Sequence, residues 1–144
     1  IQRNNMMQVE GELEQEVVAL AQDIIEEARA TDFDENSINF VPVNLPGDFT
    51  ESGNLGPEAG ETSRTDFDDF DDFNGWSGTI TTKHGENAFT LSVEVYYVDE
   101  NFVKQSAKTT FKKIDVTVSS PYLKDASENT RKYVFDFVRN YYAD

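Results

Sequence analysis

The chain has 144 residues, enough for one domain with a hydrophobic core, and its 11 Phe, 6 Tyr and one Trp favour a folded globule. It has no Cys and one His, which excludes disulfides, thiolate metal sites and cysteine nucleophiles and leaves little basis for His-dependent catalysis. The formal net charge of −16 comes entirely from residues 1–75, because residues 76–144 carry equal numbers of acidic and basic side chains. This charge argues against nucleic acid and anionic lipid as direct partners and favours cations or a basic protein surface.

Residues 4–31 have the pattern of a long amphipathic helix. Apolar side chains three or four positions apart form one stripe. The stripe consists of Met6, Val9, Leu13, Val17, Leu20, Ala21, Ile24 and Ala28, with Val18 and Ile25 widening it. No proline interrupts the run, and Gly11 weakens it by about 1 kcal/mol relative to Ala. Because Glu side chains four positions apart repel each other, we expect packing of the apolar stripe to hold the helix.

The next segment, residues 32–77, is irregular and acidic. Ile38–Val43 is a short apolar run that Pro42 restricts to an edge strand or an extended segment. Residues 44–65 form a long loop that contains four of the eight Gly, and loops of this length are usually functional or mobile. Nothing in this loop indicates a ligand.

The motif DFDDFDDFNGWSG at residues 66–78 combines five Asp with regularly spaced aromatic rings. In a tight turn or a short 3₁₀ helix, side chains at every third position share one side. The rings at this spacing are Phe67, Phe70, Phe73 and Trp76. We expect the rings to lie under a sheet and the carboxylates to face water.

Calcium binding is the alternative interpretation of this motif, because clustered carboxylates suit a hard cation. Asp72 and Asn74 fit an EF-hand loop pattern that ends on Gly75, whereas Phe70 does not. A pocket lined by Asp69, Asp72 and Asn74 would favour this alternative.

From Gly78 onwards the apolar period changes to two, which is typical of half-buried antiparallel strands. Thr79–Lys83 and Ala88–Val98 are predicted to form a hairpin around the turn 84–87, with His84 in water. One face of the second strand is apolar. Its residues are Phe89, Leu91, Val93, Val95 and Tyr97.

Two further strands are predicted in the last third of the chain. Thr109–Ser119 ends before Pro121, and because Phe111 is out of phase with the later apolar positions we expect a bulge near Lys112–Lys113. Arg131–Tyr142 fits both a helix and a strand, and its β-branched and aromatic content favours the strand.

These elements predict one α+β domain over residues 1–144, with a helix at 1–31, an acidic loop region at 32–77 and an antiparallel sheet of about four strands at 78–144. The helix stripe and one face of the sheet are the two large apolar surfaces, and they should cover each other. We therefore expect neighbouring positions in the core for Leu20, Ile24, Val93 and Val95.

Three stretches together resemble the soluble part of type IV pilin-like proteins, the group that includes minor pilins and type II secretion pseudopilins. They are the helix end LAQDIIEEARATDFDE, the motif DFDDFDDFNGWSG, and the pair VEVYYVDEN and FKKIDVTVSSP. The resemblance implies that the helix is the lower half of a longer one, whose hydrophobic upper half anchors the subunit in the inner membrane and later packs in a filament core. The lack of a Cys pair favours a minor pilin or a pseudopilin. The closing YVFDFVRNYYAD departs from the small-residue final strand expected for the family.

The resemblance further implies a structural subunit of a type IV pilus or secretion pseudopilus, in the cell envelope on the periplasmic or extracellular side. Other pilin-like subunits would be its partners, contacted through a projecting segment Ile1–Leu13 that offers Met6, Met7, Val9 and Leu13. The acidic residues of 1–75 would meet bases on a neighbour. The candidate bases are Lys104, Lys108, Lys112, Lys113 and Lys124.

We assign no catalytic residue, no metal ligand and no cofactor from the sequence. A calcium-dependent binding or adhesion module of the cell envelope is the alternative function. An enzyme is the third class considered, and it has the least support because acidic residues in a run on a polar turn are usually solvated.

Overall fold

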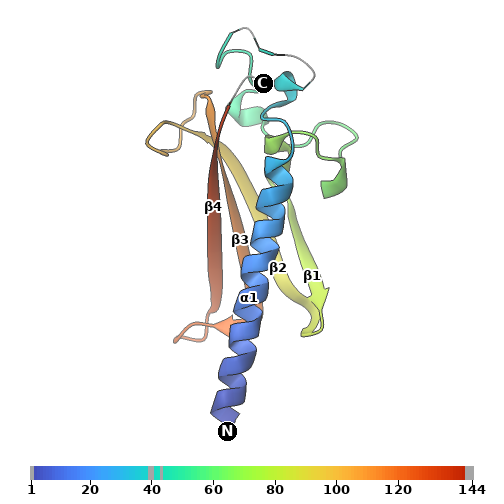
Figure 1. Cartoon of the computed structure of the whole chain (residues 1–144), viewed down its shortest axis with the longest axis vertical. Helices are drawn as coiled ribbons and strands as arrows, with labels where there is room; N and C mark the ends of the chain where they lie inside the picture. Colours follow the sequence, from blue (N-terminus) through green and yellow to red (C-terminus); the bar gives the residue numbers. More distant parts are fainter. Residues whose placement is uncertain (1, 39–40, 43, 142–144) are drawn as a thin grey trace.

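The computed structural model describes residues 2–38, 41–42 and 44–141, with side chains from residue 9 onwards. Helix α1 (Gln2–Arg29) is followed by short 3₁₀ turns η1 (Glu35–Ser37), η2 (Ser52–Asn54), η3 (Arg64–Asp66) and η4 (Phe70–Phe73). The strands are β1 (Ser77–Thr82), β2 (Gly85–Val98), β3 (Phe111–Lys124) and β4 (Thr130–Asn140). They form one antiparallel sheet in chain order, and α1 lies across one face of it (Figure 1). The predicted α+β arrangement is confirmed.

The core lies between α1 and the sheet. Five helix side chains at the predicted spacing are 0–1% exposed, namely Leu13, Val17, Ala21, Ile24 and Ala28. They share one cluster with β2 and β3 side chains that include Val93, Val95 and Ile114, and Leu20 packs against its edge. The predicted neighbourhood of these residues is confirmed, and burying each large apolar side chain contributes roughly 1.5–3 kcal/mol. Val18 does not widen the stripe, because it is 39% exposed.

Strand β3 corrects two predictions. Its pairing with β2 and β4 is continuous from Phe111 to Ser119, so the bulge expected at Lys112–Lys113 is absent. Lys112 faces the core, on the same side of the strand as Ile114. Phe111 therefore faces the other side without any break in the alternation, and no bulge is needed. The strand also does not end before Pro121. It continues to Lys124 through a register shift between Ser119 and Lys124, the kind of irregularity that accommodates a proline.

The C-terminal run is a strand, as predicted, and Tyr133, Phe135 and Phe137 of β4 pack against the core. The β1–β2 turn is tighter than expected, because Thr82 pairs with Gly85. Gly85 has a φ of +146°, and a Cβ there would lie 2.7 Å from the Tyr122 hydroxyl, so the turn requires glycine. The edge strand or extended segment expected at 38–43 lies partly outside the described residues.

Candidate functional site

Helix α1 leaves the sheet near its N-terminal end. Residues 9–12 are all exposed, and four consecutive helical positions cover a full turn, so every side of this turn faces solvent. Figure 1 shows the first turns of α1 extending beyond the ends of the strands. Val9 is 46% exposed, whereas Leu13 is 1% exposed and belongs to the core. The expectation that Leu13 projects beyond the sheet is therefore wrong. The side chains of Met6 and Met7 lie outside the described part of the structure.

Side chains from both edges of the sheet lie against the helix where it leaves the sheet, and one of them forms a hydrogen bond with it. Tyr133 of β4 donates its hydroxyl hydrogen bond to Glu14 at 3.0 Å. On the other edge, His84 Nε2 lies 3.3 Å from Glu16 Oε2, and the His84 side chain is only 14% exposed. The prediction that His84 is simply solvated is wrong, because the turn folds back onto the helix. The change from the exposed Val9 to the buried Leu13 places the exit point of α1 between these two residues, just before the contacts at Glu14 and Glu16.

The acidic motif is a docked structural turn. Phe70 and Phe73 are buried in the main core, and Phe67 and Trp76 pack against it, so the prediction for the rings is confirmed. The Phe70 N–H donates to the carbonyl of Asp32 at 2.7 Å, and this bond joins the motif to the end of α1. The main chain thus holds the motif against the helix and the sheet.

The prediction that the carboxylates of the motif face water is wrong for three of the five. Asp69, Asp71 and Asp72 are each 0% exposed, whereas Asp66 and Asp68 are exposed. The inversion arises because these carboxylates have bonding partners inside the protein. Asp69 and Asp72 accept N–H hydrogen bonds within the motif, and Asp71 accepts from the buried Lys112.

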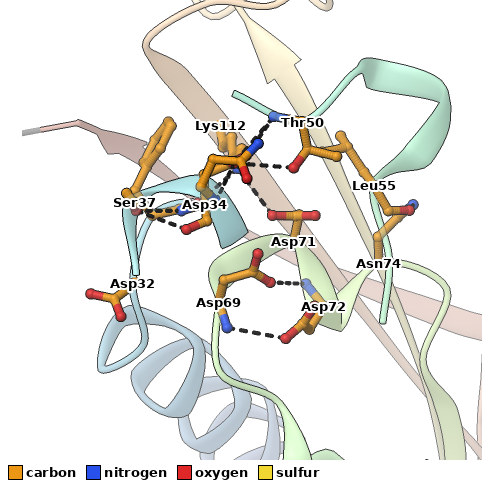
Figure 2. A network of polar contacts seen from close by, with 12 residues as sticks. Asp32, Asp34, Ser37, Thr50, Leu55, Asp69, Asp71, Asp72, Asn74 and Lys112 are labelled. Atoms are coloured by element: carbon orange, nitrogen blue, oxygen red, sulfur yellow. Dashed lines mark hydrogen bonds and ion pairs between the residues drawn. The ribbon is translucent and has the colours of Figure 1, made fainter. Parts of the chain in front are cut away.

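Lys112 forms a buried ion cluster with one of these aspartates. Its ammonium donates to Asp34 Oδ1 at 2.7 Å, Asp71 Oδ1 at 3.0 Å and the Phe33 carbonyl at 2.7 Å, and all three charged side chains are 0% exposed (Figure 2). The ammonium also lies 4.4 Å from the centre of the Phe33 ring. Each of its three N–H donors thus has an acceptor.

The two aspartates of this cluster have opposite pKa shifts. Burial pushes the pKa of Asp34 upwards, but the Lys112 charge and N–H donors from Asn36 and Thr50 outweigh it and hold that pKa below its ordinary value. For Asp71, burial prevails over the attraction of Lys112 and raises the pKa. One ammonium therefore does not fully compensate two buried carboxylates.

A second group of carboxylates overlaps this cluster at Asp71, and its other members have no basic partner among the described residues. Oxygens of Glu58, Asp69, Asp71 and Asp72 lie within 4.8 Å of one another. Two further sets of four carboxylates share Glu58 and add Glu35, Glu61 and Asp68. Asp69 Oδ2, Asp72 Oδ1 and Glu58 Oε2 are buried and accept no hydrogen bond from any described residue.

Burial and the neighbouring negative charges raise the pKa of Glu58 to about 10, of Asp69 to about 12 and of Glu35 to about 7. These directions follow from placing like charges together away from water, which favours the neutral form of each. The arrangement needs a counter-charge, which either bound protons or a cation can supply.

Asn74 takes no part in this group. Its amide nitrogen donates to the Leu55 carbonyl at 3.0 Å, and its amide oxygen accepts from the Val95 N–H at 2.8 Å (Figure 2). The pocket that Asn74 borders is lined by residues of β2, of the connection that follows β2 and of the loop 44–65, and neither Asp69 nor Asp72 is among them. The structure therefore does not bring together the predicted set of Asp69, Asp72 and Asn74.

Sequence reasoning missed Glu35 and Glu58, and it wrongly placed Lys112 among the bases that could meet a neighbouring subunit. The sequence did indicate the burial of Lys112, because Lys112 alternates with Ile114, Val116 and Val118. In a continuous strand it must face the core with them. No such indication exists for Glu58 and Glu35, since they lie in irregular segments whose positions only the fold determines.

Comparison of the chain with protein-family models, with curated proteins and with solved structures finds no match. Among the described residues, no helix combines the length and the apolar character needed to cross a membrane.

Proposed function

We propose that the chain is a structural subunit of a filament of the type IV pilus or secretion pseudopilus kind, and that it assembles through the N-terminal end of α1. The observation that supports this most directly is the exit of the helix from its own sheet. Residues 9–12 are exposed on every side, while the next apolar position, Leu13, is fully covered. A helical segment that its own domain leaves uncovered is available to a neighbour.

The occupant that we propose for this segment is the corresponding helix of another subunit of the same kind. Contacts that repeat by one screw operation are heterologous, so such an assembly grows without closing. The hydrogen bond from Tyr133 to Glu14 supports the proposal, because it joins the helix to β4 directly after the exposed turn and so restrains the direction in which the helix leaves the domain. A fixed direction is what a regular filament needs from each subunit.

The charge distribution supports contacts between acidic residues of one subunit and bases of the next, but the set of candidate bases changes. Lys112 is buried and paired with Asp34 and Asp71, so it does not belong to the bases that could meet acidic residues of a neighbour. Lys104 is exposed, with 65% of its side chain accessible, and Lys124 is exposed as well. These two are the better candidates of the original five.

The test is a substitution in the complete protein, in cells that make the filament. Val9→Glu combined with Met6→Glu should leave the domain folded and prevent its incorporation. Val134→Glu is the matched control, because Val134 is 61% exposed on the sheet face opposite α1. Leu13→Glu is unsuitable, because it would place a charge in the core.

Cross-linking identifies the occupant. The chain has no Cys, so Val9→Cys carries a maleimide photo-crosslinker at a single place. We expect assembled material to yield adducts to the helix of another subunit, and Val134→Cys to yield none there. Normal assembly of the Met6→Glu Val9→Glu variant, or adducts from residue 9 only to unrelated proteins, would refute the proposal.

A further inference from the structure

We propose that Glu58, Asp69 and Asp72, joined by nearby carboxylates, form a binding site for one Ca²⁺ ion that ties the loops at the C-terminal end of α1 together. This inference does not depend on filament assembly. It differs from the EF-hand hypothesis, because it uses Glu58 from the long loop and leaves Asn74 in its structural role.

The first argument is the geometry of the oxygens. Ca²⁺ binds 6–8 oxygen ligands at roughly 2.3–2.6 Å, so two ligands of one ion lie at most about 5 Å apart. The oxygens of Glu58, Asp69, Asp71 and Asp72 meet this limit pairwise, since all lie within 4.8 Å of one another. The two overlapping sets around Glu58 offer further carboxylates from Glu35, Glu61 and Asp68 to complete the coordination.

The second argument is independent of the clustering of acidic residues. Asp69 and Asp72 are 0% exposed, and one oxygen of each accepts no hydrogen bond from the described residues. Their other oxygens are used within the turn, because the Asp72 N–H donates to Asp69 Oδ1 at 3.1 Å and the N–H groups of Asp68 and Asp69 donate to Asp72 Oδ2. Figure 2 shows the reciprocal bonds by which the carboxylate of each of Asp69 and Asp72 accepts from the N–H of the other. A buried carboxylate oxygen without a donor is costly unless a cation or a proton occupies its lone pairs.

The third argument is charge. Lys112 is the cation nearest to Asp71, and its ammonium is already shared with Asp34 and with a backbone carbonyl. Glu58, Asp69 and Asp72 therefore have no basic partner among the described residues. Ionised carboxylates whose oxygens are buried without a donor or a basic partner are costly to hold together. A divalent ion would remove this cost.

The choice of Ca²⁺ follows from the ligands. All are carboxylate oxygens, which suit hard cations rather than zinc or copper. They come from irregular segments and are numerous, whereas Mg²⁺ prefers a strict octahedron and retains several waters.

The long loop is joined to the site by bonds just before Glu58, and a bond within the loop holds Glu58 itself. The Leu55 carbonyl accepts from Asn74, and the Gly56 N–H approaches Asp71 Oδ2 at 3.4 Å, while the Glu58 N–H donates to Glu61 Oε1 at 2.7 Å. The loop is therefore joined to η4 before its carboxylate arrives there. A bound ion would lock the loop, η4 and the segment after α1 into one unit.

The direct test is calorimetric titration of the purified chain with CaCl₂, together with melting curves in CaCl₂ and in EDTA. We expect saturable heat and, at a calcium concentration of about 100 Kd, a rise of the melting temperature of about 5–10 °C. MgCl₂ and NaCl at the same ionic strength should give a clearly smaller rise. No heat and no shift, or an equal shift with all three salts, would overturn the proposal.

Two substitutions locate the site, with a matched control in the same motif. Asp69→Asn keeps the hydrogen-bond acceptor that caps η4 and removes a charge, so it should melt at the same or a higher temperature in EDTA and lose the response to calcium. Glu58→Gln, on a loop, should lose that response as well. Asp66→Asn is the control, because Asp66 is exposed and bonds only Ser63 and Thr62, and it should respond to calcium as the parent does. A parental calcium response in both Asp69→Asn and Glu58→Gln would overturn the assignment.

Discussion

Replacing Lys112 by Met is the sharpest test of the buried ion cluster. Met fills a similar volume but removes the only ammonium within 3.0 Å of Asp34 and Asp71 in the described structure. Both carboxylates would then lie in the interior without a counter-charge, and breaking a buried pair by removing one partner costs about 3–5 kcal/mol. The total free energy of unfolding of a small domain is about 5–15 kcal/mol, so about a fifth of the stability or more would be lost.

The assay is urea unfolding followed by far-UV circular dichroism and by the fluorescence of Trp76, the one Trp of the chain. A loss of 3–5 kcal/mol corresponds to a fall of roughly 6–20 °C in melting temperature for a domain of this size. Lys113→Met is the control, because Lys113 faces the other side of the same strand and forms only partly exposed ion pairs with Asp115 and Asp136 at 3.7 and 3.2 Å. Such pairs contribute at most about 1 kcal/mol. Equal effects of the two substitutions would refute the reasoning.

Two further predictions concern the acidic cluster and the helix. In EDTA the free energy of unfolding should fall as the pH rises from about 4.5 to about 7. Burial and nearby acidic residues raise the pKa of Glu35 from 4.5 to about 7, so in this interval the folded chain keeps a proton that the unfolded chain has lost. Melting temperatures that rise over this interval would contradict the prediction. Leu13→Ala should lower the free energy of unfolding by about 2–5 kcal/mol, because it opens a cavity in the core. Val9→Ala should change it by no more than about 0.5 kcal/mol, because Val9 is exposed. Equal effects of the two substitutions in urea unfolding would show that the helix leaves the sheet at another position.

Local periodicity in the sequence was sufficient to predict the helix, the strands and most of the buried core residues. The 3.6-residue spacing of α1 identified Val17, Ala21 and Ile24 as buried, and the alternation along β2 identified its apolar face. The aromatic spacing of the acidic motif likewise placed Phe70 and Phe73 inside. These predictions succeeded because each depends only on which side chains share a face, and the backbone geometry of one element determines that.

The tertiary structure decided where the helix leaves the sheet and what the buried charges do. Val9 and Leu13 belong to the same stripe, and only the length and placement of the strands make one exposed and the other buried. Lys112 contacts Asp34 and Asp71 across 78 and 41 residues of chain, and Glu58 arrives from a loop with no periodic pattern. A charged side chain is assigned to water by its own chemistry, so its burial is decided by partners that the fold supplies from distant parts of the chain.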